Sequence, residues 1–98
     1  SQPNFKIHFT LSALVLLAGF YLQVSQSGMA ILVLTIVFGL GCEMINTSLE
    51  SMTDLITKEW RQNAKIAKDV SAGMMLLSAI GAILIAILIF GPKIGERL

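Results

Sequence analysis

Three carboxylates lie close together in a part of the sequence that borders a predicted bilayer interior. Residues 43–54 follow directly on the apolar run 29–42. Acidic side chains beside such a run are energetically costly and usually functional. On a helical wheel, four other polar side chains of this segment fall within about 60° of Glu43. We call this set the polar stripe; its members are Glu43, Asn46, Thr47, Glu50 and Asp54.

The polar stripe suits phosphoryl transfer at a membrane surface. Magnesium usually binds through one or two carboxylates plus substrate phosphates, and Glu50 and Asp54 fit that pattern. Glu43 lies about 10 Å deeper along the helix, near the lipid headgroups, where a carboxylate can accept a proton from a lipid hydroxyl. The alternative is a polar stripe that only holds helices together. Acids in one stripe repel each other unless a cation joins them, which favours the functional interpretation.

A second polar pair lies at the start of the third apolar run. Lys68 can meet nucleotide phosphate as a point charge, and Asp69 can cap the third helix or accept a hydrogen bond. The sequence contains no G-x-x-x-x-G-K-[ST] loop. We expect His8, the only histidine, to be a capping or packing residue near the interface, and Cys42 to be a small apolar filler.

Composition predicts an all-α membrane protein. Of the 98 residues, 55% are hydrophobic and 13% charged, whereas soluble domains have about 25% charged residues. The chain forms one domain, residues 1–98, with three predicted transmembrane helices at about 7–24, 29–50 and 70–90. A signal peptide is the competing interpretation of the first run, but no clear cleavage site follows it.

The predicted connections fix the lengths of the helices. A tight polar turn at 25–28 makes the first two spans antiparallel neighbours. The second helix is expected to begin near Met29 and to reach about Lys58, so its last turns extend into the cytoplasm. A polar connection, 58–69, precedes the third span, which we expect to end at Gly91-Pro92.

Basic residues give the orientation. Five lie on one side and two on the other, with none in the first turn; the five are Lys6, Lys58, Arg61, Lys65 and Lys68, and the two are Lys93 and Arg97. The N-terminus and the 58–69 connection are therefore predicted to be cytoplasmic and the C-terminus outside. A net charge of +1 gives no basic field for nucleic acid.

Two segments resemble the signature of the bacterial integral-membrane diacylglycerol and undecaprenol kinases. The first is Glu43-Met-Ile-Asn46-Thr-Ser-Leu-Glu50-Ser-Met-Thr-Asp54, and the second is Ala67-Lys68-Asp69-Val-Ser-Ala-Gly73. The resemblance covers most of the chain, including the three predicted spans and the short turn. It implies a lipid kinase of the bacterial inner membrane that uses ATP and Mg²⁺ and acts as a homotrimer with active sites shared between chains.

The resemblance also implies roles for individual residues. Glu43 would be the general base for the lipid hydroxyl, and Asn46 would orient that hydroxyl or the phosphate. Glu50 would ligate Mg²⁺ on the nucleotide. Lys68 and Asp69 would contact the nucleotide, with Asp54 as an accessory polar residue.

Two departures from the family pattern concern the N-terminus. Gln2 stands where the family commonly has a second metal-ligating glutamate, and an amide oxygen can ligate without supplying charge. The family's amphipathic surface helix is missing from these residues, and a chain that begins with Ser1 leads us to expect residues upstream.

Two other classes of function compete with the kinase. A small oligomeric transporter could couple protons through a membrane-embedded glutamate, although its acid belongs near the middle of the bilayer. A structural helper subunit would use the polar stripe only to hold helices together. Neither needs both Glu50 and the Lys68-Asp69 pair.

Overall fold

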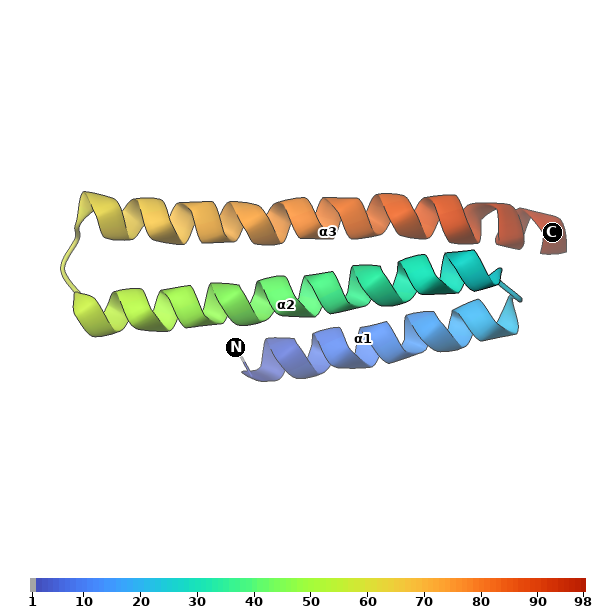
Figure 1. Ribbon diagram of the computed structural model, residues 1–98, viewed down its shortest axis with the longest axis horizontal. Coiled ribbons are helices and arrows are strands. Elements are labelled where there is room, and N and C mark those ends of the chain that lie inside the picture. The colour runs from blue at the N-terminus through green and yellow to red at the C-terminus, as the bar shows by residue number, and fades with distance from the viewer. Residues whose placement is uncertain (1) are drawn as a thin grey trace.

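Three long helices account for most of the chain. The computed structural model describes the backbone of residues 2–98 and the side chains of residues 5–98. The helices are α1 (Gln2–Tyr21), α2 (Gln26–Ile56) and α3 (Gln62–Arg97) (Figure 1). No strand occurs in residues 2–98. The predicted all-helical fold with three helices is confirmed.

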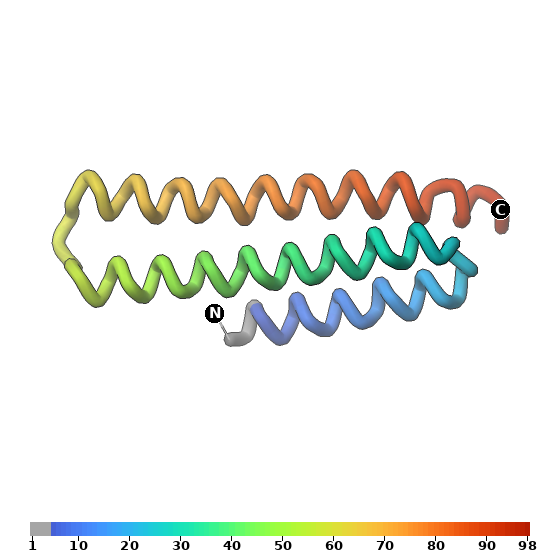
Figure 2. The backbone as a smooth tube through the Cα atoms, viewed as in Figure 1, coloured from blue at the N-terminus to red at the C-terminus, as the bar shows by residue number. Residues whose placement is uncertain are grey.

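The three helices lie side by side, with α2 in the middle. α2 packs against both α1 and α3, and the bundle measures 55 × 21 × 20 Å. α1 runs along the part of α2 nearest the first turn, and the polar ends of α2 and α3 extend beyond the start of α1 (Figure 2). The bundle therefore has three helices along its apolar part and two at its polar end.

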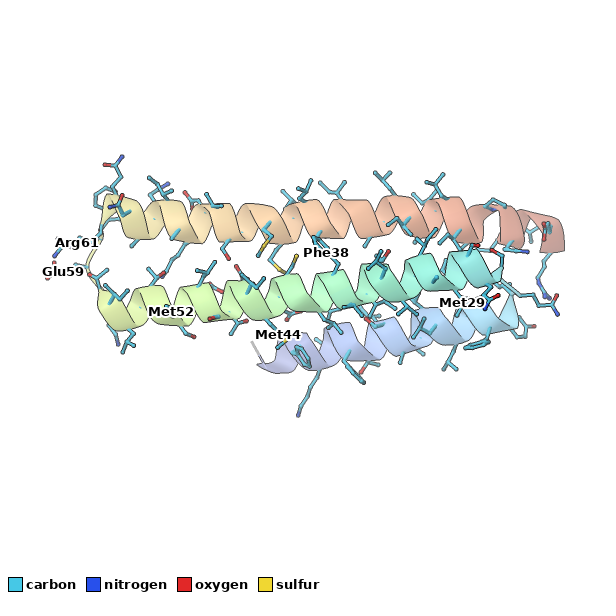
Figure 3. All side chains as sticks on the ribbon, viewed as in Figure 1. Met29, Phe38, Met44, Met52, Glu59 and Arg61 are labelled. Carbon is cyan, nitrogen blue, oxygen red and sulfur yellow. The ribbon has the colours of Figure 1, made fainter. Side chains whose placement is uncertain are left out.

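Two of the helices meet the requirements for crossing a membrane. α2 and α3 are long and apolar enough to span a bilayer, whereas the apolar part of α1, Phe5–Tyr21, is shorter. Leu32 and Cys42 are the only hydrophobic side chains that are buried among residues 5–98. Large side chains are exposed instead; examples on α2 are Phe38, Met44 and Met52, which Figure 3 labels. Such apolar surfaces suit contact with lipid or with other chains.

The connection between α1 and α2 lies three residues earlier in the chain than predicted. α2 begins at Gln26 rather than near Met29, because Ser25 is its N-cap and accepts a hydrogen bond from the Gly28 amide at 3.1 Å. The segment predicted as a turn therefore belongs largely to the first turn of α2. Gln23 makes the reversal with a φ of 59°.

The second connection is shorter than predicted. Only residues 57–61 are non-helical, and Glu59 and Arg61 in this segment form an ion pair at 3.2 Å (Figure 3). α3 begins at Gln62 because the residues that follow are mostly good helix formers and support each other through an i, i+4 ion pair. Asp69 lies inside the helix, so of its two predicted roles the cap of α3 is wrong, and acceptance of a hydrogen bond from a neighbouring donor, Lys65, is confirmed.

The end of α3 also differs from the prediction. The helix continues through Pro92 to Arg97, although Gly91-Pro92 was expected to stop it. Proline removes one backbone donor, and an apolar helix tolerates the loss when its neighbouring hydrogen bonds persist. At this end, Arg97 stacks over the Tyr21 ring at 5.2 Å and so joins α3 to the end of α1.

Candidate functional site

The polar stripe of α2 is shared between two hollows. Glu43, Asn46, Thr47 and Glu50 line an apolar groove of about 590 Å³, which also contacts α1 and α3. Asp54 instead lines a polar pocket of about 370 Å³ at the end of the bundle. The stripe thus connects an apolar groove to a polar pocket along a single helix.

Glu43 is paired with a histidine from α1. His8 Nδ1 lies 2.8 Å from Glu43 Oε2, and Glu43 is 8% exposed. His8 is predicted from the sequence to be a capping or packing residue, and its pair with Glu43 differs from that prediction. The available signal was a lone histidine in the first apolar run, since a buried carboxylate needs a polar partner.

Asn46 is held between α3 and Glu50. The Ser71 hydroxyl donates to Asn46 Oδ1, and Asn46 Nδ2 donates to Glu50 Oε1 at 3.0 Å. Ser71 is 2% exposed, which makes it the most buried side chain of residues 5–98. It was quoted only as part of a motif, and nothing in its type or spacing marked it as a contact of Asn46. The two bonds together fix which end of the amide faces Glu50.

Lys68 and Asp69 have separate partners. Lys68 Nζ donates to Asp54 Oδ1 at 2.7 Å, so α3 contributes a cation to the outer end of the polar stripe. This hydrogen bond raises the pKa of Lys68, which lies outside the predicted span 70–90. Asp69 accepts from Lys65 at 2.7 Å and does not pair with Lys68.

The polar pocket concentrates basic side chains beside an aromatic one. Its lining comes from the end of α2, the 57–61 segment and the first turns of α3. The charged and aromatic members are Asp54, Lys58, Glu59, Trp60, Arg61, Lys65, Lys68 and Asp69. Such a set of cations can hold phosphate groups. Glu50 is close enough to this end to contribute to the raised pKa of Lys68.

The residues present fit a magnesium ion that is bound partly by phosphate. No cluster of three histidine, cysteine or acidic side chains occurs in the part of the chain that the structure describes. Magnesium does not need one, because it takes one or two carboxylates and completes its shell with water and phosphate oxygens. The one hydrogen bond of Glu50 within residues 5–98 uses Oε1, which leaves Oε2 for such a role. The side chain of Gln2, predicted as a second ligand, lies outside the described residues.

Comparison with known proteins identifies the family. The model of the prokaryotic diacylglycerol kinase family matches residues 1–90. The chain belongs to this family. Its members include lipid kinases, and the resemblance drawn from the 43–54 and 67–73 segments is confirmed.

Two curated relatives carry different substrate names. The chain is 38% identical to a diacylglycerol kinase of Synechocystis over 86 residues, which are 87% of this chain and 49% of that protein. It is 35% identical to an undecaprenol kinase of Bacillus subtilis over 94 residues, or 96% of this chain and 76% of that protein. The chain therefore spans about half the length of the first relative and three quarters of the second.

Proposed function

We propose that the chain transfers the γ-phosphate of ATP to the hydroxyl of a membrane lipid alcohol. One observation carries this proposal: a single helix places a buried carboxylate in an apolar groove and leads, through Asn46 and Glu50, to a pocket rich in cations. The groove suits the lipid and the pocket suits the nucleotide. Family membership supports the same activity and favours it over a proton-coupled transporter or a helper subunit.

Glu43 is the proton acceptor in this proposal. The lipid hydroxyl oxygen forms a bond to the γ-phosphorus while the bond from that phosphorus to the bridging oxygen breaks, and ADP departs. The hydroxyl proton goes to the Glu43 carboxylate. Asn46, whose amide is fixed by Ser71, orients the hydroxyl or the phosphate.

The nucleotide binds at the polar end. Lys68 meets a phosphate, and Asp54 and Asp69 set the positions of Lys68 and Lys65. Mg²⁺, which neutralises charge on the phosphates when it is bound, would be held by Glu50, with the Gln2 amide as a second ligand. Glu50 lines the groove one turn of α2 before Asp54, which lines the pocket, and the two substrates would meet along this turn.

The assembly and the topology complete the proposal. All three helices cross the bacterial inner membrane, with the N-terminus and the 57–61 segment in the cytoplasm and the C-terminus outside. The polar end of α2 extends beyond the bilayer toward ATP. Three chains form a homotrimer with shared active sites, which would cover the open groove and the exposed apolar faces.

The lipid is either diacylglycerol or undecaprenol, as the names of the relatives suggest. Both present a hydroxyl at the interface, and the apolar lining of the groove suits either chain type. The test is transfer of labelled γ-phosphate from ATP to each alcohol by the purified full-length protein in bilayers with magnesium. We expect transfer to at least one of them. If the protein transfers phosphate to none of the lipid alcohols in a panel, the proposed kinase activity is refuted.

A further inference from the structure

The contact between His8 and Glu43 joins two helices at the proposed proton acceptor. The residues are 35 positions apart, and the distance between Nδ1 and Oε2 is 2.8 Å. The Glu43 side chain is 10% exposed and that of His8 34%. Both line the apolar groove. A bond of this kind in an environment poor in water restricts the carboxylate to one orientation.

The contact uses one carboxylate oxygen and leaves the other. Among residues 5–98, the hydrogen bond of Glu43 involves Oε2 alone. An imidazole with a proton on Nδ1 donates to a carboxylate whether the ring is neutral or charged. Oε1 then remains for the hydroxyl of a lipid in the groove. When Oε1 takes the proton of that hydroxyl, the bond between His8 and Oε2 need not break.

The backbone around His8 leaves room for its ring. Ser12 Oγ donates to the His8 backbone carbonyl oxygen at 2.8 Å, a bond within α1 that does not involve the imidazole. On the facing helix, Gly39 lies one turn before Glu43, and a Cβ there would be 3.3 Å from His8 Nε2. The lack of a side chain at Gly39 therefore makes room for the ring beside α2.

We propose that His8 is a positioning residue, whose Nδ1–H holds Glu43 with Oε1 available to the lipid hydroxyl. The proposal rests on the lipid kinase activity proposed above and adds a residue to it. It assigns no proton transfer to His8. What His8 supplies is the orientation of the carboxylate, and misplacement of a catalytic group by about 1 Å can lower a rate by about 10²-fold.

A matched pair of substitutions at His8 tests the geometry. The amide nitrogen of asparagine takes the position of Nδ1, whereas that of glutamine takes the position of Nε2. We expect His8→Asn to keep kcat within about 3-fold and His8→Gln to lower it about 10²-fold, with the KM for ATP unchanged in both. Equal kcat values for the two variants, high or low, overturn the proposal. Melting temperatures of both variants identify a loss of folding.

Two glycines of α2 give a second test that leaves His8 intact. Gly39→Ala brings a methyl group to 3.3 Å from the ring, whereas nothing lies within 4 Å of a Cβ at Gly41. Both substitutions favour the helix in the same way. We expect Gly39→Ala to lower kcat and Gly41→Ala to leave it unchanged. If the Gly39→Ala and Gly41→Ala enzymes have the same kcat, the position of the His8 ring does not control the rate.

A spectroscopic measurement separates this proposal from the kinase activity itself. The ¹⁵N chemical shift of His8 Nδ1 is compared between the wild-type protein and Glu43→Gln, both without substrates. We expect a shift that changes when the carboxylate is replaced. If the two proteins have the same shift, the pair of His8 and Glu43 is refuted, even if the wild type phosphorylates lipid. If the shifts differ but the wild type transfers no phosphate, only the kinase activity is refuted.

Discussion

Replacement of Ser71 by alanine tests whether the buried hydroxyl orients the site from α3. Ser71 donates to Asn46 Oδ1, so Asn46 Nδ2 faces Glu50 Oε1 at 3.0 Å. Alanine leaves the amide free to turn and to place its oxygen against the Glu50 carboxylate. The substitution removes one oxygen atom from a side chain that is 2% exposed, so the cavity it leaves is small.

The expected loss of kcat/KM for ATP follows from the two hydrogen bonds of the Asn46 amide. Loss of the bond from Ser71 costs about 1 kcal/mol. The bond to Glu50 is exposed, so solvent screening limits its loss to about 1 kcal/mol. Together they predict that Ser71→Ala lowers kcat/KM for ATP by about 5- to 30-fold.

The assay is the initial rate of phosphate transfer at varied ATP and at varied lipid. We expect a smaller change in the KM for lipid than in the KM for ATP, because Asn46 lines the groove but Ser71 does not. Ser48→Ala is the matched control, since Ser48 is exposed on α2 and its side-chain hydrogen bond within residues 5–98 is to the Met52 sulfur at 3.9 Å. A Ser71→Ala enzyme with wild-type kinetics for ATP refutes the idea that Ser71 orients Asn46.

Three further predictions concern charged residues. Glu43→Gln should lower kcat by about 10²-fold or more with nucleotide affinity retained, as measured by transfer and by ATP binding. Glu50→Gln should raise the magnesium concentration for half-maximal rate and weaken nucleotide binding, as measured by metal titration. Because the pKa of Lys68 is raised, its pair with Asp54 is complete below the ordinary lysine pKa and is lost as pH rises through the raised value. The melting temperature difference between the wild type and Lys68→Met should therefore stay constant from about pH 7 to 10.

Each of these predictions has an outcome that contradicts it. Full transfer by Glu43→Gln removes the general base assignment, and full transfer by Glu50→Gln removes the metal ligand. The pKa of a free lysine is about 10.4. A melting temperature difference that disappears well below pH 10 therefore shows that Asp54 does not stabilise the charged form of Lys68. The control for the last experiment is Lys93→Met, at the far end of α3, which removes a different ion pair, that of Lys93 with Glu96 at 4.0 Å.

The sequence predicted which residues share one face of a single helix. Periodicity places Glu43, Asn46 and Glu50 on one face whatever surrounds them, and the structure has them line one groove. The predicted roles of these residues stay predictions, since the structure places them without testing their chemistry. Apolar length likewise predicted three helices, because the composition of each run is a local property.

Contacts between helices could not be predicted from the sequence. His8 meets Glu43, and Ser71 meets Asn46, only because of the rotation and depth of each helix relative to α2, which no single periodicity contains. The start of α3 was misplaced for a different reason. The charged residues of 58–69 predict a polar connection, yet lysine and alanine are good helix formers, and the pair of Lys65 with Asp69 supports the helical turn.

The two lysines at the polar end have a consequence for which anions can bind. Lys68 and Lys65 already pair with Asp54 and Asp69, so under the proposed function an incoming phosphate competes with these carboxylates for the two lysines. A simple anion such as sulfate leaves the displaced carboxylate without a cation. A nucleotide that arrives with its own divalent cation returns positive charge to the same place. Under the proposed function, the polar pocket would therefore favour a nucleotide that carries a divalent cation over a bare anion.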